Sequence, residues 1–255
     1  MARPLKGFGV SGARISTWTE RAVFGPLAAI ASATWAGRGG WRRNLRLLPD
    51  GCVDLVWDGE RLAACIPAGE AIWRQVGPQS CNVGLRLRCG AGGAIVGRPL
   101  APAGAQALLA ETWGELASHG EARLRAAAGD PDRQRRILEE LVGLRLADGA
   151  RPEAEILALA ARLSQALASP VESVARAVGL EPRSLRRRFA NEVGLGPKRL
   201  QRVLRFNALL GRLAASESLA DLAAEHGYAD QAHMTRECRA LCGSTPRRLA
   251  EVLEA

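Results

Sequence analysis

Residues 219–246 read LADLAAEHGYADQAHMTRECRALCGSTP, and this segment contains the clearest structural pattern in the chain. Its first part predicts a short helix with Leu222 and Ala223 on the inward face, and Gly227 allows a sharp turn after it. Asp230 is placed to cap a second helix, because an Asp side chain accepts hydrogen bonds from the unpaired N–H groups of a first helical turn. We therefore expect two helices joined by a tight turn over residues 219–241.

The second of these helices has one apolar and one polar face. Met234, Cys238 and Leu241 recur at helical spacing and mark the buried stripe. The outward positions and those that flank them carry Gln231, Ala232, His233, Thr235, Arg236 and Arg239.

An imperfect copy of this pattern lies upstream, over residues 171–190. Gly179 supplies the turn, and Ala175 precedes it by four residues, as Ala223 precedes Gly227, so that in each copy a small side chain lets two helices approach closely. The second helix of the copy carries Arg183, Arg186 and Arg187 opposite its apolar face. Arginines on a lone helix are usually only a solvated surface, but the same arrangement occurring twice favours a shared binding role.

The chain has 255 residues, 35 Lys and Arg against 26 Asp and Glu, and a formal net charge of +9, which favours a polyanionic partner.

A helix is expected between the copies, over residues 197–214, with a length of about 25 Å at 1.5 Å per residue. Successive major grooves on one face of B-DNA lie about 34 Å apart. Allowing for helix widths, a rigid helix of this length can hold two DNA-reading helices in adjacent major grooves.

These motifs strongly resemble the AraC/XylS family of bacterial transcription regulators over residues 153–253. The matching motifs are Gly194-Leu-Gly-Pro197, then Arg199, Arg202 and Arg205, then residues 219–228, Asp230-Gln-Ala-His233, Arg236-Glu237 and Gly243-Ser-Thr-Pro246. The resemblance implies two helix-turn-helix units, at about 171–190 and 219–241, which bind a promoter or operator in double-stranded DNA. The implied DNA-binding residues are Arg183, Ser184, Arg186, Arg187, Gln231, His233, Thr235, Arg236 and Arg239.

Arg186, Arg187 and Arg236 are the preferred base readers, because Arg bonded bidentately to guanine is the commonest specific contact. The remaining basic residues are expected to anchor phosphates. Cys238 and Cys242 stand where the family usually has phenylalanines, and Met234 where it has an aromatic, so a smaller core is expected in the second unit.

The first half predicts an α+β fold, with an antiparallel β-barrel or sandwich over residues 44–89 and covering helices from residue 101 onward. Pro49-Asp50-Gly51 and Asp58-Gly59 supply turns. Residues 148–152 are polar and contain Gly and Pro, which places a boundary between a regulatory domain, 1–150, and a DNA-binding domain, 151–255. Residues 47–56, 83–87 and 90–93 resemble an uncharacterised domain often found ahead of AraC-type helices, which implies regulation without naming an effector.

The six tryptophans all lie in the first half. Trp18, Trp57 and Trp73, with Asp54, are the candidates for a small-molecule effector pocket, since Trp can line an apolar site. The same tryptophans can equally fill a core, and Asp50 and Asp54 can simply serve a turn.

Two other functions remain open from the cysteines. One is a DNA repair or alkyl-transfer protein with Cys52 as the reactive thiol, and the other is a thiol switch acting through Cys52, Cys81 or the Cys238/Cys242 pair. The cysteine spacing does not match a zinc site, and no nucleophile constellation is present, so we expect no enzyme, metal or cofactor. An apolar signal core and a membrane span are also absent, which predicts a cytoplasmic protein. RNA polymerase and a second copy of the chain are further partners that the sequence leaves open.

Overall fold

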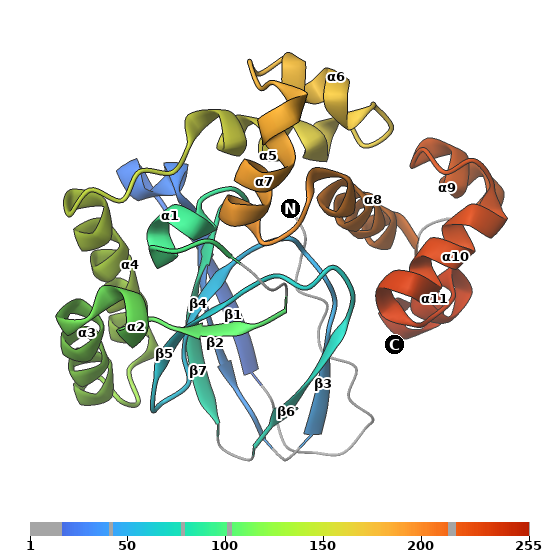
Figure 1. Ribbon diagram of the computed structural model, residues 1–255. Helices are drawn as coiled ribbons and strands as arrows, with labels where there is room; N and C mark the ends of the chain where they lie inside the picture. The colour runs from blue at the N-terminus through green and yellow to red at the C-terminus, as the bar shows by residue number, and fades with distance from the viewer. Residues whose placement is uncertain (1–16, 41–42, 78–79, 101–103, 214–217, 255) are drawn as a thin grey trace.

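The computed structural model describes residues 17–40, 43–77, 80–100, 104–213 and 218–254. A β-sheet domain with its own helices comes first in the chain, and an all-helical region follows (Figure 1). The expected α+β class and the expected antiparallel sheet are confirmed.

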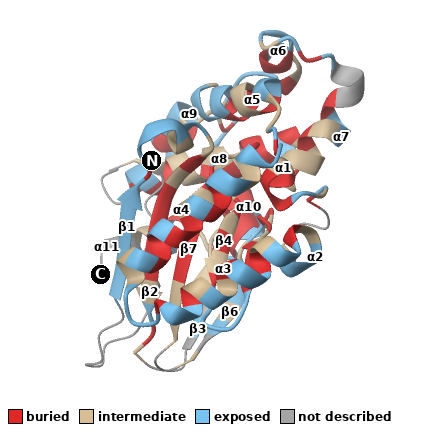
Figure 2. Ribbon diagram, turned by 90° about the vertical axis from the view of Figure 1, so that its left-hand side faces the viewer, coloured by how far each residue is buried: buried red, intermediate tan, exposed pale blue. Residues whose placement is uncertain are grey.

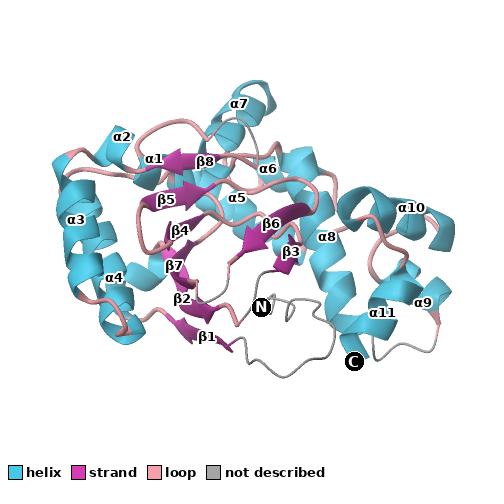
Figure 3. Cartoon of the chain, turned by 90° about the horizontal axis from the view of Figure 1, so that it is seen from below, coloured by secondary structure: helices cyan, strands magenta, loops and turns pink. Residues whose placement is uncertain are grey.

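The β domain contains a six-stranded antiparallel sheet in the order β1-β2-β7-β4-β5-β8 and a two-stranded sheet, β3-β6. Figure 3 shows α3 and α4 on one side of the large sheet and the β3-β6 pair on the other. The strands are β1 Thr17–Ala22, β2 Ala31–Arg38, β3 Arg43–Leu47, β4 Asp54–Trp57, β5 Leu62–Cys65, β6 Ile72–Val76, β7 Cys81–Leu87 and β8 Gln106–Leu108.

Of the two expected turns, one forms a hairpin and the other connects two sheets. Asp58 joins β4 to β5, and its carboxylate accepts hydrogen bonds from the backbone N–H groups of Glu60 and Arg61 at 2.9 and 2.8 Å. Pro49-Asp50-Gly51 instead leads from the small sheet into the large one, because β3 pairs with β6 and not with β4. The strand partners of β3 lie far along the chain, so its own alternation could not identify them.

The β domain also contains helices, of which α3 and α4 cover one face of the large sheet. Their bounds are η1 Gly25–Ala29, α1 Gly92–Val96, α2 Ala110–Trp113, α3 Glu115–Ala126 and α4 Pro131–Ala147. The buried sides of α3 and α4 face the sheet, and their outer sides are exposed (Figure 2).

Two expectations for this region are wrong in detail. Residues 106–108 form strand β8 beside β5 and not the start of a helix. The following helical stretch breaks at Gly114, whose φ of 54° and ψ of −123° lie outside the helical region.

The hydrophobic side chains form two cores. One lies between the large sheet and its helices and extends to Ala150, and the other begins at Ile156 and fills the helical region. The helices of the second region are α5 Ala154–Gln165, α6 Val171–Arg176, α7 Pro182–Val193, α8 Pro197–Leu213, α9 Leu219–Glu225, α10 Gln231–Cys242 and α11 Pro246–Glu254. Among the described residues, no helix is both long enough and apolar enough to cross a membrane.

Candidate nucleic-acid interface

Helices α6 and α7 form the first helix-turn-helix unit, and α9 and α10 form the second, with α8 between them (Figure 1). Both turn glycines have positive φ, 77° at Gly179 and 71° at Gly227, which a residue with a side chain rarely adopts. Ala175 and Ala223 are each 0% exposed, so the small side chains do lie between packed helices as the repeat predicted.

The apolar face of α10 is fully packed. Met234 and Cys238 are 0% exposed, and Leu241 and Cys242 are nearly so. These smaller side chains occupy the positions where aromatic residues were expected from the resemblance. The cap is also confirmed, because Asp230 Oδ1 accepts a hydrogen bond from the His233 backbone N–H at 2.5 Å.

The opposite face of α10 forms a shallow groove of about 460 Å³. Its lining residues are Gln231, Ala232, Thr235, Arg236 and Arg239. Four of these side chains are exposed and Thr235 is half-buried. All five belong to the outward set expected from helical spacing, so the local pattern and the tertiary surface agree here.

His233 lies apart from this groove. Its ring stands edge-on to Tyr228, with 5.5 Å between ring centroids, and its Nδ1 accepts a hydrogen bond from the Ala229 backbone N–H at 3.3 Å. His233 Nε2 is 4.0 Å from Glu237 Oε1. The structure therefore places His233 against the turn between α9 and α10 and beside Glu237, which is the residue that bonds to Arg202 of α8.

In the first unit, α7 presents exposed arginines opposite its packed face. Arg186 and Arg187 are exposed, whereas Leu185 and Phe189 are 5% and 0% exposed. Arg188 Nε donates to Glu153 Oε2 at 2.9 Å, which ties α7 to the start of α5. The side chains of Arg183 and Ser184, two of the expected DNA-binding residues, lie outside the described part of the structure.

Most basic residues of α8 have partners within the protein. Arg202 Nε donates to Glu237 Oε1 at 2.5 Å, and Arg205 Nη2 donates to the Leu167 carbonyl at 2.9 Å. Lys198 pairs with Glu172 at 3.3 Å. These contacts orient α8 against both units, which leaves Arg202 and Arg205 less available as phosphate anchors than their sequence positions suggested.

The four candidate effector residues do not form one pocket. Trp18 stacks on Trp35 at 4.6 Å, and Trp35 Nε1 donates to Asp54 Oδ1 at 3.2 Å, so Trp18 and Asp54 belong to one face of the large sheet. Trp57 lies on the opposite face, 2% exposed in the core, because residues three apart on a strand point to opposite sides. Trp73 is 67% exposed on β6.

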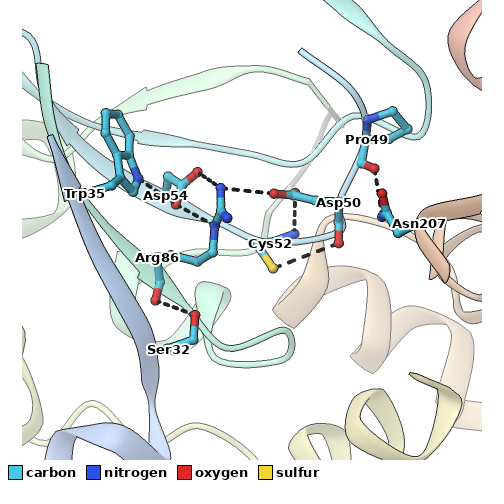
Figure 4. Close-up of polar contacts among 8 residues, drawn as sticks. All are labelled: Ser32, Trp35, Pro49, Asp50, Cys52, Asp54, Arg86 and Asn207. Carbon is cyan, nitrogen blue, oxygen red and sulfur yellow. Dashed lines mark hydrogen bonds and ion pairs between the residues drawn. The ribbon is translucent and has the colours of Figure 1, made fainter. Parts of the chain in front are cut away.

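Sequence reasoning missed Arg86, the central residue of this polar face. Its Nη2 lies 3.1 Å from carboxylate oxygens of both Asp50 and Asp54, and its Nε donates to Asp54 Oδ1 at 3.1 Å (Figure 4). Burial raises the pKa of Asp50, although the positive charge of Arg86 opposes that shift. The sequence did contain one indication of this cluster. Arg86 is the single arginine in the alternating segment 83–87, and Asp50 and Asp54 are the two aspartates that lie opposite it.

Burial protects most of the thiols. It raises the pKa of Cys89 and that of Cys238 to about 12, and it also raises the pKa of Cys52, Cys65 and Cys242. A thiol that stays protonated is a poor nucleophile and a poor metal ligand. Within the described residues no group of His, Cys, Asp or Glu is arranged to hold a metal ion.

A family model described as a helix-turn-helix domain matches residues 174–251, which contain most of both units. The chain matches no curated protein. Among solved structures it is similar to ToxT from Vibrio cholerae O395, with a TM-score of 0.42 and 7% identity over 94% of this chain and 97% of that chain. It is also similar to ToxT of Vibrio cholerae strain SCE256 bound to an unsaturated fatty acid, with a TM-score of 0.41 and 8% identity over 98% and 97% of the two chains.

Proposed function

We propose that the protein is a transcription regulator of the AraC type, whose C-terminal helix-turn-helix domain reads two adjacent patches of one DNA site. In this proposal α7 and α10 enter successive major grooves on one side of the duplex, and α8 sets the distance between them. The β domain is the regulatory part, and the whole protein acts in the cytoplasm without catalytic chemistry.

The observation that carries the proposal is the α10 groove. An exposed face with two arginines, a glutamine and a threonine offers several hydrogen-bond donors to base edges, while the other face of the helix is packed. Arg186 and Arg187 give α7 a comparable exposed face. Two such helices in one chain suit a bipartite DNA site better than a protein or small-molecule partner.

The two cysteine-based functions have less support. A repair or alkyl-transfer protein needs a reactive thiolate, and the pKa of Cys52 is raised by burial and by the nearby carboxylate of Asp50. Cys238 and Cys242 are both buried on the packed face of α10. A thiol switch at these positions would first require the surrounding structure to open.

Selection from genome fragments tests the proposed function. Purified protein is mixed with sheared DNA at physiological salt, and the retained fragments are sequenced. We expect one motif with two patches about one helical turn apart. The Arg187→Ala/Arg236→Ala double variant should lose the motif, whereas Arg133→Ala, which removes an exposed arginine of α4, should retain it. Retention of fragments without any shared motif would overturn the proposal of sequence-specific binding.

A further inference from the structure

The β domain contacts both helix-turn-helix units and the helix between them. At the first unit, the Leu100 backbone N–H donates to the Asn191 carbonyl at 2.9 Å, and the Ala94 N–H donates to Glu192 Oε2 at 2.9 Å. Asn191 and Glu192 belong to the last turn of α7. The C-terminal end of the first reading helix is therefore fixed to α1 and to the segment that follows it.

The second reading helix is held at its own C-terminal end. The Ala71 backbone N–H donates to the Leu241 carbonyl at 2.6 Å, and Arg46 Nη1 donates to Ser244 Oγ at 3.4 Å. Ala71 precedes β6 and Arg46 lies on β3, so the small sheet forms this contact. Neither contact involves the groove residues of α10, which leaves the exposed face free while the helix is anchored.

The third contact lies between these two, on α8, and it involves the loop that leads into β4. Asn207 Nδ2 donates to the Pro49 carbonyl at 3.0 Å (Figure 4). Gly51 packs so closely that a Cβ there would stand 2.3 Å from Leu200 Cδ1, and its φ is 77°. The loop thus contacts α8 at Leu200 and at Asn207, about two turns apart, and it has a conformation at Gly51 that suits glycine alone.

The same loop is also attached to the interior of the large sheet. Asp50 Oδ2 pairs with Arg86, and Asp50 Oδ1 accepts a hydrogen bond from the Cys52 N–H at 2.9 Å. Arg86 is in turn fixed by Asp54 on the neighbouring strand. A continuous series of contacts therefore runs from β7 and β4 through Asp50 and the Pro49 carbonyl to Asn207.

We infer that Asp50 and Asn207 are positioning residues that set the spacing between the two reading helices. This inference rests on the proposed function, because it concerns how the same two helices meet DNA. Because α8 joins the two units and the loop holds α8 against the sheet, loosening the loop lets α8 shift relative to the ends of α7 and α10 that the β domain holds. A conformational change inside the β domain would be transmitted to α8 through the Asp50–Arg86 ion pair.

The test measures spacing discrimination, not affinity alone. The selected site is compared with a site that has one added base pair between the patches and with a single patch. For Asn207→Ala we expect the affinity ratio between the native and the lengthened site to fall about fivefold, the effect of losing one hydrogen bond. Affinity for the single patch should stay within about twofold of wild type, a result that general loss of folding would not give. Asn82→Ala on β7 is the matched control and should keep the wild-type ratio.

A second variant examines the other end of the series. Asp50→Asn keeps the side-chain shape and removes the charge that binds Arg86, and it should lower the ratio by a similar factor. Because Asp50 and Asn207 belong to one series of contacts, the effects of the two substitutions on the affinity ratio should not add. The Asp50→Asn/Asn207→Ala double variant should therefore have about the same ratio as either single variant. Wild-type ratios in both single variants, with intact thermal melting, would overturn the inference. A wild-type protein that selects no two-patch site would instead contradict the proposed function.

Discussion

Replacing Arg236 with alanine is the sharpest test of how the second unit reads DNA. Arg236 is exposed in the α10 groove and makes no ion pair within the described part of the chain, so its loss should change the free energy of unfolding by less than about 0.5 kcal/mol. A bidentate arginine–guanine contact contributes about 1–3 kcal/mol, which corresponds to a loss of about 5- to 150-fold in affinity for the selected site. Binding is measured by fluorescence anisotropy on the selected site and on its single-base variants, at several salt concentrations.

The pattern across sequences distinguishes base reading from phosphate contact. If Arg236 reads a base, the alanine variant should lose discrimination at one base pair of the second patch and nowhere else. Arg187→Ala should do the same at one base pair of the first patch. Equal weakening on every sequence, with the salt dependence lowered by about one ion, would refute base reading and make Arg236 a phosphate anchor. Arg133→Ala controls for the loss of one positive charge.

Other predictions concern the packing, the caps and the thiols. Phe189→Ala should lower the free energy of unfolding by about 3–5 kcal/mol in denaturant titration, because the ring is fully buried, and a loss below 1 kcal/mol would contradict that packing. Asp230→Ala should cost about 1 kcal/mol through loss of the α10 cap, whereas Asp230→Ser should recover most of it. The raised pKa of Cys238, about 12, leaves about one thiol in ten thousand ionised at pH 8, so alkylation of the native protein followed by mass spectrometry should be about a thousandfold slower than for a free thiol. Rapid modification of Cys238 in the folded protein would support the thiol-switch hypothesis.

The helix-turn-helix units were predictable because the contacts that define them are local. Gly227, Asp230 and the stripe from Met234 to Leu241 lie within a few turns of one another, so helical spacing alone identified the buried and exposed faces of α10. The same local rules predicted the long helix between the units, which the structure places at Pro197–Leu213. The repeat added an expectation that neither copy supports alone, namely that the two arginine-bearing faces share a binding role.

The tertiary structure determined which side chains meet across the chain. Sequence alternation made residues 83–87 a strand, but it could not pair Arg86 with Asp50 and Asp54, which lie more than thirty residues away. Nor could it show that Arg202 is bound to Glu237. Strand order and interdomain packing depend on the burial of surfaces from the whole chain, whereas helix periodicity and capping depend only on near neighbours. The sequence therefore determined what each DNA-binding helix presents, and only the fold determined how those helices are held.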